Sequence, residues 1–433
     1  AYVSVELMKG LKYKLNLTPD FQFYRYNSYE GLFDFGLAKH DITAVTEQQT
    51  RTRNILVENL LTFDRTFGDH KVSALVGYTY QDSRYRYMQG SGQGMPTGIT
   101  EIDAASQGLA VSGNSSRSVL TSILGRAFYS YKNRYLLTAT IRRDGSSKFG
   151  SNYRYGNFPS VSVGWNIAEE DFVKNSVSWL DQLKLRGGYG VLGNQEIDNY
   201  QYVSVVTTGI NYPDGKSGLI QGAFPKTFAN PDIKWEKSYQ QNYGVDMTLF
   251  NSLSLSVDYW RTQQRGVLCQ SDLTPALSGF TGDKLPYTNV GKVQNQGVDI
   301  EVGYSKKWNS GFEIGVTGDF AWNKNEIIDA NDLNYSSIGY YYPFRKTGYS
   351  IGQKFGYLID YSNGNGFFNS RQEIADRKLV YQGVTPRVGD FIYRDLNSDG
   401  LIDERDKAPL DGVKTMPSFM AGASVQMKYK NFD

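Results

Sequence analysis

The sequence has 433 residues, and its 46 Lys and Arg nearly balance its 44 Asp and Glu, so the net charge of +2 indicates neither a nucleic-acid partner nor a polybasic membrane patch. Aromatic residues make up 14% of the chain, with 45 Gly and 12 Pro, which favours an all-β protein. No run of about 18 apolar residues is present, and this excludes a helical membrane protein. The mean hydropathy of -0.47 fits a soluble protein, and equally a β-barrel in which every second strand residue meets lipid.

The chain has few cysteine and histidine residues for thiol or imidazole chemistry. A single cysteine, Cys269, permits no internal disulfide, and His40 and His70 leave little for zinc or for histidine-based catalysis. We interpret all three as loop or wall residues.

In chain order, the sequence predicts long strands joined in pairs by short turns. An alternating strand opens the chain, and later pairs meet at Gly68–Asp69, at residues 132–134, at Asn251–Ser252 and at residues 306–310. Between the pairs lie Gly-, Ser- and Asn-rich stretches at residues 27–50, 90–116, 195–232, 269–286 and 329–415. We count about 13 strands, many of them reaching the length of about 9–11 residues that a tilted membrane strand needs.

Two places break this alternation of short and long connections. Residues 149–155 make a short connection where a long one is due. Residues 168–182 predict a short amphipathic helix where a turn is due, because Val173, Val177 and Leu180 share one helical face. We expect that face to pack against neighbouring strands.

The strands around residues 243–260 and 297–322 each have one apolar and one polar face. Alternate side chains of a strand point to opposite faces. The apolar set includes Val245, Leu255, Ile300 and Val316, and the polar set includes Asp246, Asp258, Ser256, Asp299, Glu301, Thr317 and Asp319.

This alternation fits a soluble β-sandwich or an outer-membrane barrel. Aromatic residues at strand ends, such as Tyr243, Tyr304 and Trp322, match the interfacial girdle of a barrel. The strands are also longer than the five or six residues usual in soluble sheets. We therefore predict that the apolar set faces lipid and the polar set faces the lumen.

Longer motifs closely resemble one family. They are "YLLTATIRRDGSSKFGSNYRYGNFPSVSVGWNIAEEDF" (135–172), "LKLRGGYGVLGNQEI" (183–197), "NPDIKWEKSYQQNYGVDM" (230–247), "NVGKVQNQGVDIEVGY" (289–304), "GDFIYRDLNSDGLIDERD" (389–406) and the final "SVQMKYKNFD". In this order they resemble the SusC-like (SusC/RagA-type) TonB-dependent transporters of Bacteroidetes outer membranes.

The resemblance implies a transmembrane antiparallel β-barrel of 22 strands, with long extracellular loops and short periplasmic turns. It implies import of bulky nutrients, either oligosaccharides or peptides, without enzymatic activity. The implied partners are a SusD-like surface lipoprotein, the periplasmic TonB protein and outer-membrane lipid. Residues 1–433 then form a middle-to-late part of the barrel, and we expect a plug domain, the TonB contact and the last strands to lie outside this sequence.

One motif carries its own chemistry, "DLNSDGLIDERD" at residues 395–406. It has the spacing of an EF-hand calcium loop, with Gly400 at the sharp turn and Asp in place of the usual final Glu. The alternative is an Asx-rich turn held by side-chain-to-backbone bonds. Because several carboxylates converging on one loop repel one another without a cation, we predict a structural Ca²⁺ site on the extracellular side, with ligands Asp395, Asn397, Asp399, Leu401 (carbonyl), Asp403 and Asp406.

Two smaller signals admit both a structural and a binding interpretation. Residues Arg142, Arg143, Asp144, Lys148 and Arg154 gather at one strand end, where we favour an internal network over contact with a sugar or peptide. The aromatic stretch at residues 337–361 could stack on sugar rings, contact the lipoprotein or pack within its own loop.

Three functions remain on the sequence alone. Active TonB-dependent import is the first, and a passive porin is the second. The third is a soluble all-β glycan-binding protein or glycosidase, although no stretch of the sequence indicates the carboxylate pair of a glycosidase.

Overall fold

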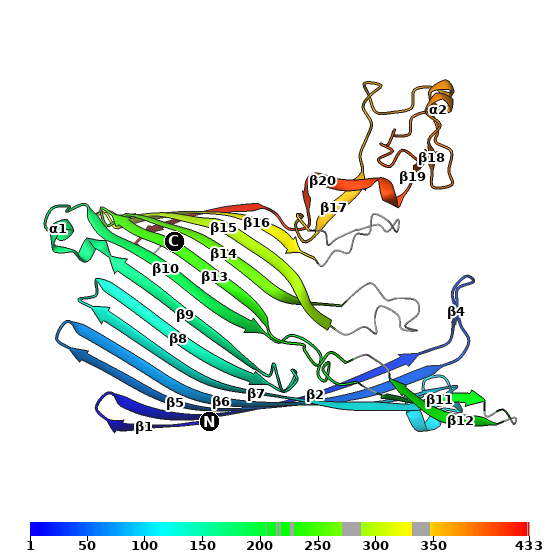
Figure 1. The fold of residues 1–433 in the computed structure, drawn as a ribbon, viewed down its shortest axis with the longest axis horizontal. Helices are drawn as coiled ribbons and strands as arrows, with labels where there is room; N and C mark the ends of the chain where they lie inside the picture. The colour runs from blue at the N-terminus through cyan, green and yellow to red at the C-terminus, as the bar shows by residue number, and fades with distance from the viewer. Residues whose placement is uncertain are drawn as a thin grey trace. The chain divides into compact units, whose positions relative to one another are not determined.

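The computed structural model describes residues 1–204, 206–213, 215, 218–225, 229–270, 287–330, 347–430 and 432. Within these residues, thirteen strands are hydrogen-bonded in one antiparallel sheet in the order β1-β2-β5-β6-β7-β8-β9-β10-β13-β14-β15-β16-β21 (Figure 1). The all-β prediction is confirmed, and the predicted number of about 13 matches the strands of this sheet; eight further short strands lie outside it among the described residues. The bounds are β1 (Tyr2–Met8), β2 (Leu11–Glu30), β5 (Ala44–Phe67), β6 (His70–Gln93), β7 (Gln107–Tyr131), β8 (Tyr135–Ser146), β9 (Tyr155–Asn166), β10 (Leu180–Asn194), β13 (Glu236–Leu249), β14 (Leu253–Gln270), β15 (Tyr287–Lys307), β16 (Phe312–Asp329) and β21 (Phe419–Tyr429).

The short turns fall where the sequence predicts them. The turn between β13 and β14 has Phe250 at φ 52° and Asn251 at φ 48°, and the turn between β7 and β8 has Lys132 and Asn133 at φ 51° and 56°. Two consecutive residues with positive φ form the tight turn whose twist matches antiparallel strands. These turns fix the register, and β13 and β14 pair without a break from Leu249↔Leu253 to Lys237↔Arg265.

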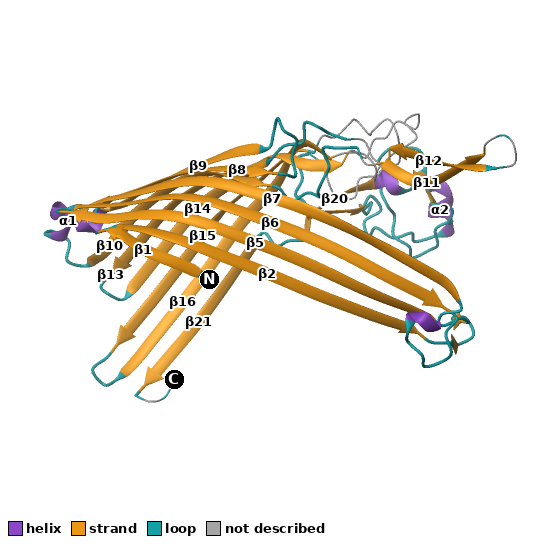
Figure 2. Cartoon of the chain, turned by 90° about the horizontal axis from the view of Figure 1, so that it is seen from below, coloured by secondary structure: helices purple, strands orange, loops and turns teal. Residues whose placement is uncertain are grey.

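The chain divides into two compact units, and the first comprises residues 1–164, 190–236 and 270–288. Its sheet strands β2, β5, β6 and β7 lie side by side (Figure 2). Small strand pairs and one 3₁₀ turn occupy the long connections: β3 (Phe33–Asp34), β4 (Lys39–His40), β11 (Val206–Pro213), β12 (Leu219–Pro225) and η1 (Ile102–Ala104).

A small aromatic core lies within this unit. Phe149 is fully buried, and its ring lies 5.0 Å from that of Trp235. Phe158 packs on the same Trp235 ring at 5.3 Å. The Phe158 ring also covers Gly156 and Gly193, where an added Cβ would lie within 2.4 Å and 2.1 Å of ring carbons. Glycine is therefore required at both positions.

The second unit comprises residues 165–189, 237–269 and 289–433. It holds β13 to β16 and β21, together with the connection between β16 and β21 (residues 330–418, here the β16–β21 connection). The described part of that connection contains β17 (Gln353–Tyr357), α2 (Arg371–Arg377), β18 (Val380–Tyr381), β19 (Leu401–Ile402), η6 (Glu404–Asp406) and β20 (Lys407–Lys414).

Helices are few and short among the residues that the structure describes. The helix expected over residues 168–182 is wrong in length: η2 (Ile167–Glu169) and α1 (Asp171–Lys174) give one turn each, and β10 already begins at Leu180. Val173 is buried, as expected of its apolar face. In the β16–β21 connection, Ser370 caps α2 by accepting the N–H of Glu373. Within the described residues no helix is long and apolar enough to cross a membrane.

Candidate functional site: the polar face of the sheet and the β16–β21 connection

The register separates the two predicted faces of the second unit. Asp246 lies directly opposite Ser256, and Val245 lies opposite Val257. Ile300 opposes Phe320, and Val316 lies between Tyr304 of β15 and Val425 of β21. On the other face Thr317 opposes Ser424, and their hydroxyl oxygens are 2.6 Å apart. The predicted apolar set and polar set therefore occupy opposite faces.

An arginine that the sequence reasoning did not single out organises the polar face. Arg186 of β10 donates from Nε and Nη2 to Asp246 of β13 at 2.7 and 2.8 Å. It also donates from Nη1 and Nη2 to Asp258 of β14 at 3.0 and 2.8 Å. All three side chains are 22–30% exposed. One guanidinium thus crosslinks three strands with charge-assisted bonds.

The contacts of Arg186 with Asp246 and Asp258, here called the arginine clamp, depend on a glycine. A Cβ at Gly244 would lie 2.5 Å from Asp258 Oδ1 and 2.8 Å from the Arg186 guanidinium. Because Gly244 lies directly opposite Asp258 in the register, the empty side-chain position leaves room for the carboxylate and the arginine. A sequence signal existed, since Asp246 and Asp258 share a face across a predicted hairpin and need a cation.

The charged residues predicted at one strand end, residues 142–154, form an internal network, which is the interpretation that we favoured. Arg142 donates to Asp144 at 2.6 Å and to the Ser122 hydroxyl at 3.0 Å. Lys148 donates to the Ile197 carbonyl at 2.7 Å. Two members do not follow this pattern. Arg143 stacks on the Tyr155 ring at 4.9 Å, and the backbone carbonyl of Arg154 accepts the Trp235 indole N–H at 3.1 Å.

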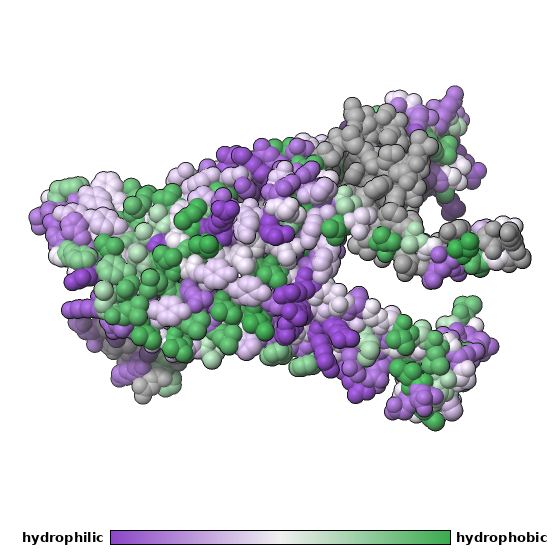
Figure 3. Space-filling view, turned by 60° about the horizontal axis from the view of Figure 1, so that its bottom comes forward, coloured by the Kyte–Doolittle hydropathy of each residue, from purple (hydrophilic) through white to green (hydrophobic). Residues whose placement is uncertain are grey.

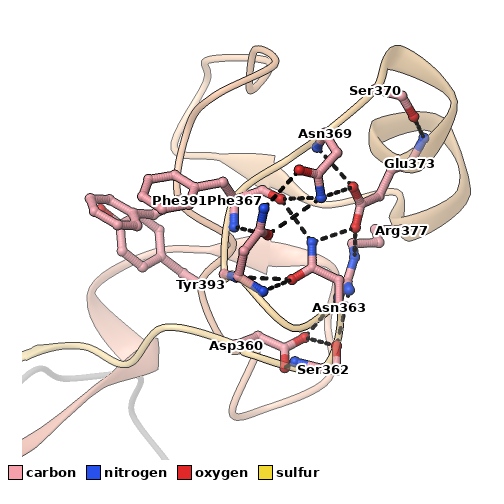
Figure 4. A network of polar contacts seen from close by, with 12 residues as sticks. Asp360, Ser362, Asn363, Phe367, Asn369, Ser370, Glu373, Arg377, Phe391 and Tyr393 are labelled. Carbon is pink, nitrogen blue, oxygen red and sulfur yellow. Dashed lines mark hydrogen bonds and ion pairs between the residues drawn. The ribbon is translucent and has the colours of Figure 1, made fainter.

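The β16–β21 connection is folded around polar contacts at α2 (Figure 4). Arg377 donates to Asp360 at 2.7 Å and lies 3.4 Å from Glu373. Glu373 also accepts from the Asn363 amide at 2.9 Å and from the backbone N–H of Asn369 at 2.9 Å. These side chains fix a segment that has little regular structure of its own.

The same contacts set the ionisation of the two carboxyl groups. Hydrogen bonds from Ser362, aided by Arg377, lower the pKa of Asp360 below its usual value. The backbone N–H of Asn369, together with Asn363 and Arg377, lowers the pKa of Glu373. Both groups are therefore held as carboxylates.

Aromatic side chains pack within this connection. Phe367 stacks on Phe391 with ring centroids 4.6 Å apart, and Tyr393 contacts both Tyr357 and Tyr381. Of the aromatic stretch at residues 337–361, residues 337–346 lie outside the described residues. In the described remainder Tyr349 packs edge-on against Phe355, and Tyr361 is exposed. Packing within the connection accounts for most of the described rings, and sugar stacking stays a prediction.

The residues predicted to bind calcium lie in one tight loop, and their oxygens accept bonds from the loop itself. Asp395 accepts the N–H of Gly400 at 2.7 Å. Asp406 is fully buried and accepts the N–H groups of Leu396 and Asp403, both at 2.8 Å. These bonds give the loop the form of an Asx-rich turn.

Arg405 supplies positive charge within this loop. Its guanidinium lies 2.8 Å from Asp399 and 2.7 Å from Asp403, and it lowers the pKa of Asp403. The Asn397 amide donates to Asp399 at 2.9 Å, and the Leu401 N–H donates to the same side chain at 2.8 Å. In the described part of the chain no three His, Cys, Asp or Glu side chains are placed to hold a metal ion. Calcium binding at this loop stays a prediction.

Comparison with known proteins identifies similar chains. The family model described as "TonB dependent receptor-like, beta-barrel" matches residues 4–412. TonB-dependent receptor P39 of Formosa agariphila is 28% identical over 462 residues, covering 100% of this chain and 43% of that protein. TonB-dependent receptor SusC of Bacteroides thetaiotaomicron is 32% identical over 329 residues, covering 73% of this chain and 30% of that protein.

A solved structure shows the same fold. The RagAB peptide importer in its closed-closed state matches with a TM-score of 0.77 at 22% identity, covering 99% of this chain and 45% of that chain. The chain spans less than half the length of each of these relatives.

Proposed function

Because the chain belongs to the TonB-dependent receptor-like β-barrel family, we propose that it forms part of the wall of an outer-membrane importer for bulky nutrients, oligosaccharides or peptides. The observation that carries this proposal is the separation of the sheet into an apolar and a polar face where residues 298–304 of β15 pair with residues 316–322 of β16. An apolar outer face and a polar lumen are the design of a transmembrane barrel.

The proposal includes the partners and the location. The barrel lies in the outer membrane of a Gram-negative bacterium of Bacteroidetes type, and a SusD-like lipoprotein covers it on the cell surface. TonB supplies the energy from the periplasmic side. Similarity to SusC and to RagAB supports this pairing. The protein carries out transport and no chemical reaction on its cargo.

Uptake in cells tests the function. The full-length gene is deleted, and growth is measured on oligosaccharides and on peptides as sole nutrients, in strains with and without TonB. We expect loss of growth on one nutrient class in both the gene deletion and the TonB deletion. Growth that needs the gene but not TonB would instead support the passive porin. A protein that stays soluble and monomeric without detergent would contradict both.

Affinity purification tests the partner. A tag on the full-length protein should recover a surface lipoprotein from detergent extracts in near-equal amount. Recovery of the barrel alone under conditions that preserve its fold would contradict the lipoprotein part of the proposal and leave the import part standing.

A further inference from the structure

Five arginines lie on one face of three neighbouring strands in the first unit. Arg53 of β5 lies directly opposite Arg84 of β6, which lies directly opposite Arg117 of β7. Two residues further along, Arg51 lies opposite Arg86. Cross-strand partners and residues two apart on one strand share a face. All five side chains, here called the arginine patch, therefore emerge from the same side of the sheet.

That side is the apolar one. On β5 the same face carries Ile55, Val57 and Leu61, with Asn59 as its one polar residue, because these positions differ from Arg53 by even numbers of residues. On β6 and β7 it carries Val76 and Ile123, which are 59% and 60% exposed. The opposite face of these strands carries most of their polar residues, although leucines alternate with them: Glu58, Thr62, Thr79, Gln81, Ser118 and Ser122, with Leu56, Leu60, Leu75, Leu120 and Leu124. In a membrane barrel the patch thus faces outward, and not into the lumen.

The position of the patch along the strands matches the membrane surface. From Phe63 to Ile55 the apolar face of β5 runs for roughly 26 Å at about 3.3 Å per residue. With the usual strand tilt this corresponds to roughly 20 Å of depth, close to the apolar band of about 25 Å in outer-membrane barrels. Arg53 and Arg51 follow directly, on the side away from the short turn at Gly68. Figure 3 shows hydrophilic residues gathered where the long strands leave the hydrophobic zone.

The charges of the patch are only partly balanced. Asp82 is buried and lies 2.8 Å from Arg117, 3.3 Å from Arg84 and 3.6 Å from Arg53. Five guanidinium groups against this one carboxylate leave an excess of four positive charges. The three paired arginines remain 37–48% exposed.

The pairing of Arg53 within the patch is incomplete. The Nε of Arg53 is buried and has no hydrogen-bond partner. Like charges directly opposite one another also destabilise a sheet, and the patch contains two such rows. An oxyanion with several acceptor oxygens, bound by the exposed parts of these side chains, would offset the repulsion between the rows, and guanidinium groups bind phosphate in a bidentate manner.

We propose that the arginine patch binds the phosphate of a phosphorylated glycolipid headgroup, of the lipid A class, in the outer leaflet of the outer membrane. The lipid chains would lie along the apolar face formed by Val57, Leu61 and Val76, while the phosphate meets the guanidinium groups above them. The inference rests on the membrane placement of the barrel and is independent of what the barrel imports.

The experiment uses the full-length protein in detergent. Binding of lipid A is measured by native mass spectrometry for the wild type and for Arg51→Gln/Arg86→Gln. These two arginines are chosen because neither contacts Asp82, so the substitution leaves the ion pairs of the patch in place. Arg126→Gln/Lys71→Gln is the control, because it removes the same charge from the opposite face of β6 and β7.

We expect binding of lipid A to be about 30-fold weaker in Arg51→Gln/Arg86→Gln and unchanged in the control. Each arginine near an anionic lipid surface strengthens binding about fivefold, and the two factors multiply. Dephosphorylated lipid A should bind the wild type as weakly as lipid A binds this variant. Inorganic phosphate alone should compete only at millimolar concentration. Equal binding by the variant and the wild type would overturn the proposal, and so would tight binding of free phosphate. Nutrient uptake measured on the same variants separates this result from the import function.

Discussion

At the scale of single residues, the polar face is held together by charge pairs that cross strands. The alternation predicts which residues share a face, and so predicts that Asp246 and Asp258 are neighbours. It does not reveal that Arg186 reaches both, because that depends on which strand pairs with β13 on its other edge. The arginine is found only when strand order and register are known together.

Replacing Arg186 tests this clamp. Arg186→Ala leaves two half-buried carboxylates facing each other, and we expect a loss of about 1–3 kcal/mol of stability. Thermal unfolding of the full-length protein in detergent measures it. Asp246→Asn added to Arg186→Ala should recover part of the loss. An unchanged melting temperature in Arg186→Ala would show that the clamp contributes nothing to stability.

Calcium titration tests the loop at residues 395–406. If the prediction holds, Ca²⁺ binds with a Kd of about 10⁻⁴–10⁻³ M, and Asp395→Asn abolishes binding. Asp411→Asn, an exposed acid outside the loop, serves as the control. Calorimetry on the full-length protein is the measurement. No heat of binding up to millimolar Ca²⁺ would leave Arg405 as the cation of this loop.

At the scale of elements, sequence reasoning succeeds for strands and fails for long connections. A period of two over ten or more residues is a strong signal, and short turns that need positive φ mark its ends. The helix expected at residues 168–182 is too long, because three apolar residues at helical spacing also fit a turn followed by a strand. In the β16–β21 connection, contacts such as Arg377 with Asp360 and Glu373 have no period that a sequence displays.

Acid should loosen the β16–β21 connection. The folded pKa values of Asp360 and Glu373 are lowered. Both carboxylates therefore stabilise the fold above their unfolded pKa values of about 4, and this stability is lost as pH falls through the lowered values. Hydrogen exchange of residues 360–377, corrected for the intrinsic rate, should speed up below about pH 4. Arg377→Gln should show fast exchange already at neutral pH. Equal protection of the wild type at neutral pH and below about pH 4 would contradict this account.

Single charges should distinguish the two faces of β15. Ile300→Arg places a charge on the lipid face and should cost about 2–4 kcal/mol near the membrane midplane. Asp299→Arg, one residue away on the polar face, should cost much less and is the matched control. Folded yield in outer membranes, read from resistance to unfolding in detergent, measures both. Equal tolerance of the two substitutions would contradict the assignment of faces.

At the scale of the whole molecule, motif resemblance and strand alternation give the same result. Alternation alone fits both a sandwich and a barrel, since each has one polar face. The long motifs decide between them, and the family model confirms the decision over residues 4–412. Substrate class and the lipoprotein contact stay proposals, because they depend on long connections and on parts of the relatives that this chain does not cover.

The central claim is that the apolar face meets lipid while the polar face lines a water-filled lumen. Spin labels on single cysteines test it most directly, in the full-length protein in membranes, with Cys269 and any cysteine outside residues 1–433 replaced by Ser as the background. Labels at positions 245, 255, 300 and 316 should collide with oxygen dissolved in lipid, and labels at positions 246, 256, 299 and 317 with a water-soluble nickel chelate. Accessibility should thus alternate with a period of two. Equal access of the water-soluble chelate to both sets would contradict the account.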